Sequence, residues 1–268
     1  MSTIGATCSK AHDPPLLPST NRRCHDRHDR PRAGPARYTP LVLPLVALLL
    51  NPTADARDIV FAGRVWHVKS GYGGPGPNHW SDAPDSVWVD AAGLHLRLRE
   101  VGGTWYGAEV YSAACTRPGT HRFYLDAALE DLDVNVIAAP FLYRDDLNEL
   151  DIEFARWGDP TADVGQFVVQ PSAVERFELN LAGTYTTHTI RWRPTEVRFI
   201  SVHGHYAFPP DPGLVIHRWR YAGPDLPEID GMRVHLNLWL MSGLPPTDGA
   251  EVEIVLTDVE LPPPVPCP

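Results

Sequence analysis

Apolar and polar residues alternate with a period of two through most of the chain from residue 58 onward. The alternation is clearest at residues 86–89, 94–99 and 251–256. Successive side chains of a β-strand point to opposite faces, so the pattern predicts strands that bury one face. Further strands are expected at residues 104–111, 121–130, 134–143, 164–170, 184–193, 196–203, 214–221 and 232–241. No segment has the longer period that is typical of an amphipathic helix.

Clusters of glycine and proline separate these segments and mark the turns between short strands. They lie at residues 71–77, 209–213, 223–227 and 243–246. Many short antiparallel strands in a chain of this length fit one domain made of two packed sheets. We therefore expect an all-β fold over residues 57–268. The predicted architecture is a two-sheet antiparallel β-sandwich, or jelly roll, with a concave substrate-binding sheet.

Residues 1–56 have a different character and predict a leader. Residues 41–50 form an apolar run that is shorter than the roughly 20 residues a membrane-spanning helix needs. Arginines precede the run, and an Ala-x-Ala pattern ends at Ala56, which is typical of a secretory signal peptide. The charged segment before the run is long for a signal peptide and leaves the true translation start open. We expect a secreted or periplasmic protein with no membrane span.

The charge balance narrows the choice of partners. The whole chain has a net charge of −10, and the leader contains seven Lys or Arg but only four Asp or Glu. The remaining domain is therefore more acidic than the whole chain, and we expect an acidic surface with no cluster of Lys or Arg. Nucleic acids and anionic lipids bind basic surfaces, so neither is expected as a partner. A monomer is expected.

One strand carries an unusual row of acids. Three carboxylates, Glu149, Asp151 and Glu153, alternate with the apolar Leu150, Ile152 and Phe154. On a strand the apolar residues can enter a core, and the three acids then share the opposite face. Like charges on one sheet face repel, so an ordinary strand gains nothing from this row. A pair of positioned carboxyl groups is what hydrolysis of a glycosidic bond requires.

A second strand, at residues 233–240, has a similar division. Its apolar residues occupy alternate positions, and His235, Asn237 and Trp239 lie on the other face. Polar groups beside a large aromatic ring suit a sugar, because its hydroxyls form hydrogen bonds and its C–H face stacks on the ring. An outer face with an incidental tryptophan is the competing interpretation. His188 and Trp192 share a face with Ile190, which favours a place in the core.

The acidic motif and three flanking segments resemble glycoside hydrolase family 16. Residues 149–153 are similar to its Glu-x-Asp-x-Glu signature, and residues 185–194, 236–239 and 105–110 resemble other strands of that family. The resemblance implies a jelly-roll enzyme that cleaves O-glycosidic bonds of a β-glucan-type polysaccharide with retention of configuration. The chain lacks the extra residue that some members carry before the last Glu. It therefore resembles the branch with a regular strand.

The resemblance also assigns roles to residues. It implies Glu149 as nucleophile, Glu153 as acid/base and Asp151 as the acid that holds the nucleophile in place. The charge of Glu149 is expected to raise the pKa of Glu153. Substrate-binding residues are expected among Tyr143, Trp157, His235, Asn237 and Trp239. The family's Trp-Pro-x-x-Trp segment is absent here, so Tyr143 and Trp157 are candidates to replace it, and the substrate stays open.

Two other functions compete with the hydrolase. A transglycosylase would use the same carboxyls with a sugar hydroxyl in place of water. A non-catalytic, lectin-like jelly roll would share the fold, because one architecture supports both binding and hydrolysis. The row of three acids favours an enzyme, since a lectin needs no such set.

No cofactor is expected for catalysis. A structural calcium ion is compatible with the resemblance, but the sequence does not locate one, and Asp145 and Asp146 are better explained as a solvated loop. No metal site is predicted. Cys115 and Cys267 are the two cysteines that follow the leader, and both a disulfide and two free thiols are compatible with the sequence.

Overall fold

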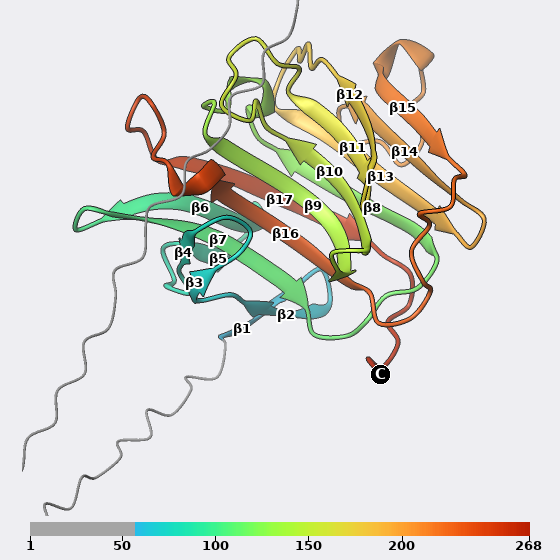
Figure 1. The fold of residues 1–268 in the computed structure, drawn as a ribbon, viewed down its shortest axis with the longest axis horizontal. Helices are drawn as coiled ribbons and strands as arrows, with labels where there is room; N and C mark the ends of the chain where they lie inside the picture. Colours follow the sequence, from blue (N-terminus) through green and yellow to red (C-terminus); the bar gives the residue numbers. More distant parts are fainter. Residues whose placement is uncertain (1–56) are drawn as a thin grey trace, which may run out of the picture. The chain divides into compact units, whose positions relative to one another are not determined.

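The computed structural model describes residues 57–268, which form two antiparallel β-sheets packed face to face (Figure 1). This arrangement confirms the predicted all-β jelly-roll sandwich, and the described residues contain no α-helix. The predicted signal peptide, at residues 1–56, lies outside the described residues. Within residues 57–268, no helix is long and apolar enough to cross a membrane.

The first sheet has eight strands, each antiparallel to its neighbours. In spatial order these are β1 (Asp58–Phe61), β2 (Arg64–Val68), β7 (Thr104–Ser112), β16 (Arg233–Leu240), β9 (Val136–Asp145), β10 (Asn148–Phe154), β11 (Gly165–Val169) and β12 (Ala173–Phe177). The central strands of this sheet therefore come from distant parts of the sequence.

The second sheet has seven antiparallel strands. In spatial order these are β5 (Val87–Val89), β6 (Leu94–Val101), β17 (Val252–Glu260), β8 (Gly119–Asp126), β13 (Tyr185–Arg193), β14 (Glu196–His203) and β15 (Val215–Tyr221).

Shorter elements complete the fold. A hairpin of β3 (Gly71–Gly73) and β4 (Asn78–Trp80) lies beside β7, and β4 pairs with it in parallel. Three short 3₁₀ turns are η1 (Leu129–Asp131), η2 (Pro212–Leu214) and η3 (Met241–Gly243).

The hydrophobic core fills the space between the two sheets. From β10 of the first sheet, Leu150, Ile152 and Phe154 are fully buried in it, and Ile190 and Trp192 of β13 are fully buried in the same cluster. Removal of such side chains from water is the main contribution to folding, at about 1.5–3 kcal/mol for each large apolar residue. The core therefore fixes which face of β10 points away from it.

His188 belongs to the same buried layer, as the sequence predicted. Its Nδ1 lies 2.8 Å from Ser201 Oγ, and its Nε2 lies 2.8 Å from Thr186 Oγ1. Burial lowers the pKa of His188 to about 3, so the ring is neutral and both nitrogens are hydrogen-bonded. The core interpretation of His188 and Trp192 is confirmed.

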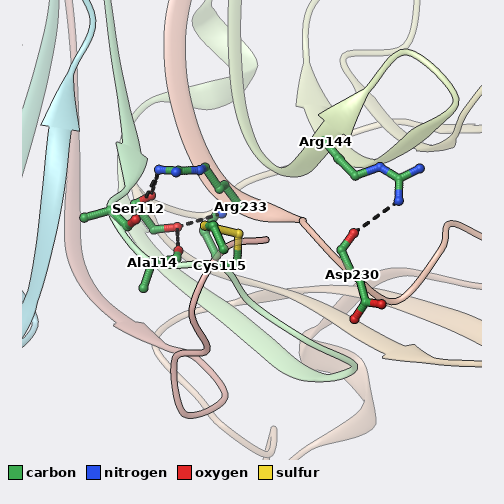
Figure 2. The surroundings of a disulfide bond; sticks show 9 residues. Ser112, Ala114, Cys115, Arg144, Asp230 and Arg233 are labelled. Atoms are coloured by element: carbon green, nitrogen blue, oxygen red, sulfur yellow. Dashed lines mark hydrogen bonds between the residues drawn. A yellow bond between two sulfur atoms is a disulfide. The ribbon is translucent and has the colours of Figure 1, made fainter.

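A disulfide between Cys115 and Cys267 attaches the C-terminal segment to the end of β7 (Figure 2). The backbone adds to this link, because Cys115 N donates to Val265 O and Val265 N donates to Cys115 O, at 3.0 and 2.9 Å. Nearby, Arg233 at the start of β16 donates to the carbonyl of Ser112 at 2.9 Å (Figure 2). The open question of two thiols or a disulfide is thus settled as a disulfide in the structure.

We expect removal of this disulfide to lower stability substantially. The bridge joins residues 152 positions apart, and closing so long a loop restricts the unfolded chain strongly. The double variant C115S/C267S should lose about 2–5 kcal/mol in free energy of unfolding, measured by urea denaturation. Reduced wild-type protein should unfold with the same midpoint as the variant. Equal midpoints for the variant and the oxidised wild-type protein would contradict the expectation.

Candidate active site

Strand β10 places the three acids on the face of the first sheet that points away from the core. Its register with β9 is regular from Glu149, opposite Tyr143, to Phe154, opposite Ala138. Its register with β11 is also regular and places Glu153 opposite Gln166. No bulge therefore interrupts the strand between Glu149 and Glu153, as the missing insertion predicted. Because the strand stays regular, alternation alone directs all three acids to one side.

The three acids line a cleft of about 560 Å³ on this face. Four strands of the first sheet and the loop before β4 contribute to its walls. The lining residues are Lys69, Gly74, Pro75, Glu109, Tyr111, Ala139, Phe141, Tyr143, Asp146, Glu149, Asp151, Glu153, His235, Asn237 and Trp239. The cleft thus contains the acids of β10 together with the polar and aromatic residues that the sequence predicted on residues 233–240.

The pKa values of all three acids are raised above their ordinary values. Burial is the largest cause in each case. Burial and the charges of Glu153, Asp146 and Glu109 raise the pKa of Glu149 to about 7. The sequence expectation that the charge of Glu149 is what raises the pKa of Glu153 needs correction, because burial of Glu153 is the main cause.

Asp151 and Glu149 influence each other in opposite directions. A side-chain hydrogen bond between them lowers the pKa of Glu149 and raises that of Asp151. These signs are those of a protonated Asp151 that donates to the Glu149 carboxylate. Asp151 is only 3% exposed, and burial raises its pKa well above the ordinary value. A hydrogen bond of this kind from the central acid stabilises the ionised form of Glu149.

Glu153 has its own partner on the adjacent strand. Gln166 of β11 donates a hydrogen bond from Nε2 to Glu153 Oε2. This bond and the charge of Arg176 lower the pKa of Glu153 and partly offset the effect of burial. The sequence reasoning missed Gln166. The signal was available, since Gln166 alternates with the buried Phe167 in a predicted strand.

His235 lies in the cleft within a charged network that the sequence reasoning also missed. His235 Nδ1 is 3.0 Å from Glu109 Oε1, and Glu109 Oε2 accepts from Lys69 Nζ at 2.7 Å. The imidazole stacks on the ring of Tyr111, with centroids 5.4 Å apart. Glu109 and Tyr111 follow the alternation of β7 and lie opposite Asn237 and His235. Period two in β7 could have placed both residues on the cleft face.

The remaining predicted binding residues occupy different places. Asn237 is 2% exposed, and its Oδ1 has no hydrogen-bond partner among the described residues. Tyr143 and Trp239 both line the cleft. Trp157 does not line it. Its ring packs edge-on against Trp239, with centroids 6.1 Å apart, so it contacts the cleft wall without lining the cleft.

The acids at the hairpin before β10 accept hydrogen bonds from neighbouring side chains. Asp145 accepts hydrogen bonds from Asn148 Nδ2 at 2.7 Å and Arg144 Nε at 2.8 Å. Asp146 accepts from Tyr143 at 3.1 Å. Across residues 57–268, no three His, Cys, Asp or Glu side chains gather in a way that could hold a metal ion.

The fold is similar to that of several solved structures. A β-1,3-glucanase from Mycobacterium marinum has a TM-score of 0.55 at 20% identity, with 78% of this chain and 92% of that chain covered. A family 16 glycosyl hydrolase from Mycobacterium smegmatis has a TM-score of 0.55 at 17% identity, with the same coverage. A protein from Mycobacterium tuberculosis described as a pseudo β-1,3-glucanase has a TM-score of 0.51 at 18% identity, with 72% and 89% covered.

No protein-family model and no curated protein matches the sequence. At the level of the fold, the likeness to β-glucanases and family 16 glycosyl hydrolases confirms the resemblance predicted from the sequence, and the chain has the jelly-roll fold of glycoside hydrolase family 16.

Proposed function

We propose that the protein is a retaining endo-glycosidase that hydrolyses O-glycosidic bonds of a β-glucan-type polysaccharide. The observation that carries the proposal is the row of Glu149, Asp151 and Glu153 in one cleft, each with a raised pKa. A retaining glycosidase needs one carboxylate that attacks and one carboxylic acid that protonates the leaving oxygen. The β-glucan substrate class is supported by the similar solved structures, two of which are named as a glucanase and a family 16 hydrolase.

In the first step, Glu153 donates its proton to the glycosidic oxygen. Glu149 attacks the anomeric carbon with a carboxylate oxygen, and the bond from that carbon to the leaving sugar breaks. The raised pKa of Glu153 favours its protonated form, which a general acid needs. The hydrogen bond that Asp151 donates stabilises the ionised form of Glu149, which is the form that attacks.

In the second step, water releases the bound sugar. The charge of Glu149 has disappeared into the ester, and Glu153 is ionised after giving up its proton. Glu153 takes a proton from water as the water oxygen attacks the anomeric carbon, and Glu149 leaves as a carboxylate. Both carboxyls return to their starting states. If a sugar hydroxyl replaces water, the same step gives transglycosylation.

The cleft offers suitable contacts for a sugar chain. Trp239 and Tyr143 provide aromatic surface, and the unsatisfied Oδ1 of Asn237 can accept a hydrogen bond from a sugar hydroxyl. His235 is held in position by Glu109 and by the Tyr111 ring. These residues are proposed to bind substrate, and Trp157 to support Trp239 from behind.

A non-catalytic, lectin-like protein is the second candidate. One similar structure is described as a pseudo β-1,3-glucanase, so this fold also occurs in a protein of that description. Calorimetric binding of glucan oligomers without any cleavage after prolonged incubation would favour this candidate. Product analysis on a glucan panel would separate hydrolysis from transfer, because transfer yields oligomers longer than the substrate.

The variants E149A and E153A should each lose release of reducing sugars from β-1,3-glucan or mixed-linkage glucan. E149A lacks the nucleophile and E153A lacks the general acid and base. We therefore expect kcat to fall at least about 10³-fold in each variant. Glu178 directly follows β12, is exposed and does not line the cleft, so E178A is the matched control with wild-type rate. Wild-type-like release by E149A or E153A would refute the assignment.

Added azide should distinguish the two roles on an activated aryl glycoside. In E149A, azide can attack the anomeric carbon directly and give a glycosyl azide of inverted configuration. In E153A, Glu149 still forms the ester, and azide then gives a product of retained configuration. The configuration of each product, read by NMR, is the measurement. Retained product from E149A and inverted product from E153A would reverse the two assignments.

Asp151 should set the acid side of the pH profile. Glu149 attacks only when ionised, so kcat/KM should rise as pH increases through its pKa of about 7. Asp151 lowers that pKa by hydrogen bonding, and D151A should therefore move the acid limb to higher pH. D151N keeps a donor and should move the limb less. An acid limb at the same pH in wild type and D151A would contradict the role given to Asp151.

A further inference from the structure

A basic groove lies on the outer face of the second sheet, away from the core. Its volume is about 600 Å³, and five arginines line it together with Thr189, Phe199, Ile200, Ala207, Phe208, Pro209 and Trp219. The arginines are Arg122, Arg191, Arg198, Arg218 and Arg220. The sequence predicted a surface without a basic cluster, and this expectation is wrong. The arginines are scattered along the chain and meet only through strand pairing.

Strand register sets three of these arginines side by side. Arg191 of β13 lies opposite Arg198 of β14, and Arg198 lies opposite Arg220 of β15. A parallel row places Arg122 of β8 opposite Thr189, and Arg218 opposite Ile200. Like charges directly opposite each other on a sheet destabilise it. The sheet face therefore carries a cost in stability that its own packing does not require.

Two carboxylates neutralise part of this charge. Glu196 accepts from Arg198 Nε at 2.9 Å and from Arg220 Nε at 2.6 Å. Glu260 pairs with Arg122. Arg191 and Arg218 form no ion pair and no side-chain hydrogen bond within residues 57–268, so the groove keeps an excess of positive charge. This excess contrasts with the net charge of −10 of the whole chain.

An aromatic residue stands at the rim of the groove. Phe208, in the segment between β14 and β15, is 76% exposed. Its ring lies 5.7 Å from the guanidinium of Arg122. An exposed aromatic ring at this position can stack on the C–H face of a sugar. The groove thus combines guanidinium groups with an apolar platform.

We propose that this groove binds a carboxylate-bearing polysaccharide, a chain of uronic-acid units, at a site separate from the cleft. Arginine forks match carboxylates in a two-point geometry. Glu196 already shows that a carboxylate fits between Arg198 and Arg220, and the unpaired Arg191 and Arg218 are free to take carboxylates of a ligand. Phe208 would stack on a sugar ring of the same chain.

The positive charge is concentrated in one groove, which favours a single polysaccharide strand over wider polyanions. The arginines are confined to one groove, while the chain as a whole is acidic. A membrane or a nucleic-acid duplex extends beyond the groove, and the net negative charge of the chain disfavours both. A narrow uronate chain can lie within the groove, where its carboxylates meet the arginines and a sugar ring meets Phe208.

The test is calorimetric binding of polygalacturonate oligomers to the full chain at low salt. The wild-type protein should bind, and binding should weaken as salt is added. R191Q/R218Q should bind at least about tenfold more weakly, because it loses two charge-assisted contacts. The double variant R97Q/R117Q removes the same charge outside the groove and should bind like the wild type. Equal affinities of R191Q/R218Q and R97Q/R117Q would overturn the proposal.

A second variant and three further probes complete the test. F208A removes an exposed ring without disturbing the core, and it should weaken binding about threefold or more. Wild-type affinity of F208A for polygalacturonate would contradict the proposed stacking of Phe208 on a sugar ring and, with it, the polysaccharide as ligand. Tighter binding to dextran sulfate, to anionic phospholipid vesicles or to single-stranded RNA than to polygalacturonate would also overturn it. E149A should bind polygalacturonate as the wild type does, because Glu149 lies in the cleft and not in the groove. Binding at the groove can therefore be tested even if the proposed hydrolysis fails.

Discussion

One strand has to satisfy two environments at once, and the cleft depends on it. Leu150, Ile152 and Phe154 of β10 are fully buried between the sheets, and their burial fixes the orientation of the strand. Because side chains alternate along a strand, the three acids of β10 then lie on the face opposite the core. The carboxyls on the other side are themselves buried by the walls of the cleft, and this burial raises their pKa values. Packing and reactivity are therefore set by the same seven residues.

Much of the fold follows from local pattern, and the site follows in part. Alternation was sufficient for β10 and β16, because their apolar positions are uninterrupted, and it placed Asn237 and Glu153 on the cleft face. No separate strand was predicted for the short β1, β2, β3, β4 and β12, although the equally short β5 and β11 were recognised within the predicted strands 86–89 and 164–170.

The contacts between strands could not be read from the sequence. Glu109 meets His235 across the pairing of β7 with β16, which are more than 120 positions apart. Gln166 meets Glu153 across a register that depends on where β11 begins. Trp157 is close to Glu153 in sequence, yet the chain turns after β10 and carries its ring behind Trp239. Proximity along the chain was thus a poor guide to membership in the cleft.

The Cys115–Cys267 disulfide turns more than half of the described chain into a covalent ring. Strands β8 to β17, with all three acids and every arginine of the groove, lie inside that ring. A protease that cuts an exposed connection such as the one bearing Phe208 opens the ring but releases no fragment. After a single cut the two pieces would stay covalently joined until the disulfide is reduced. Core packing between the sheets could keep them in their native positions during that time. Outside a reducing environment, this domain can therefore remain a single covalent unit after one backbone cleavage.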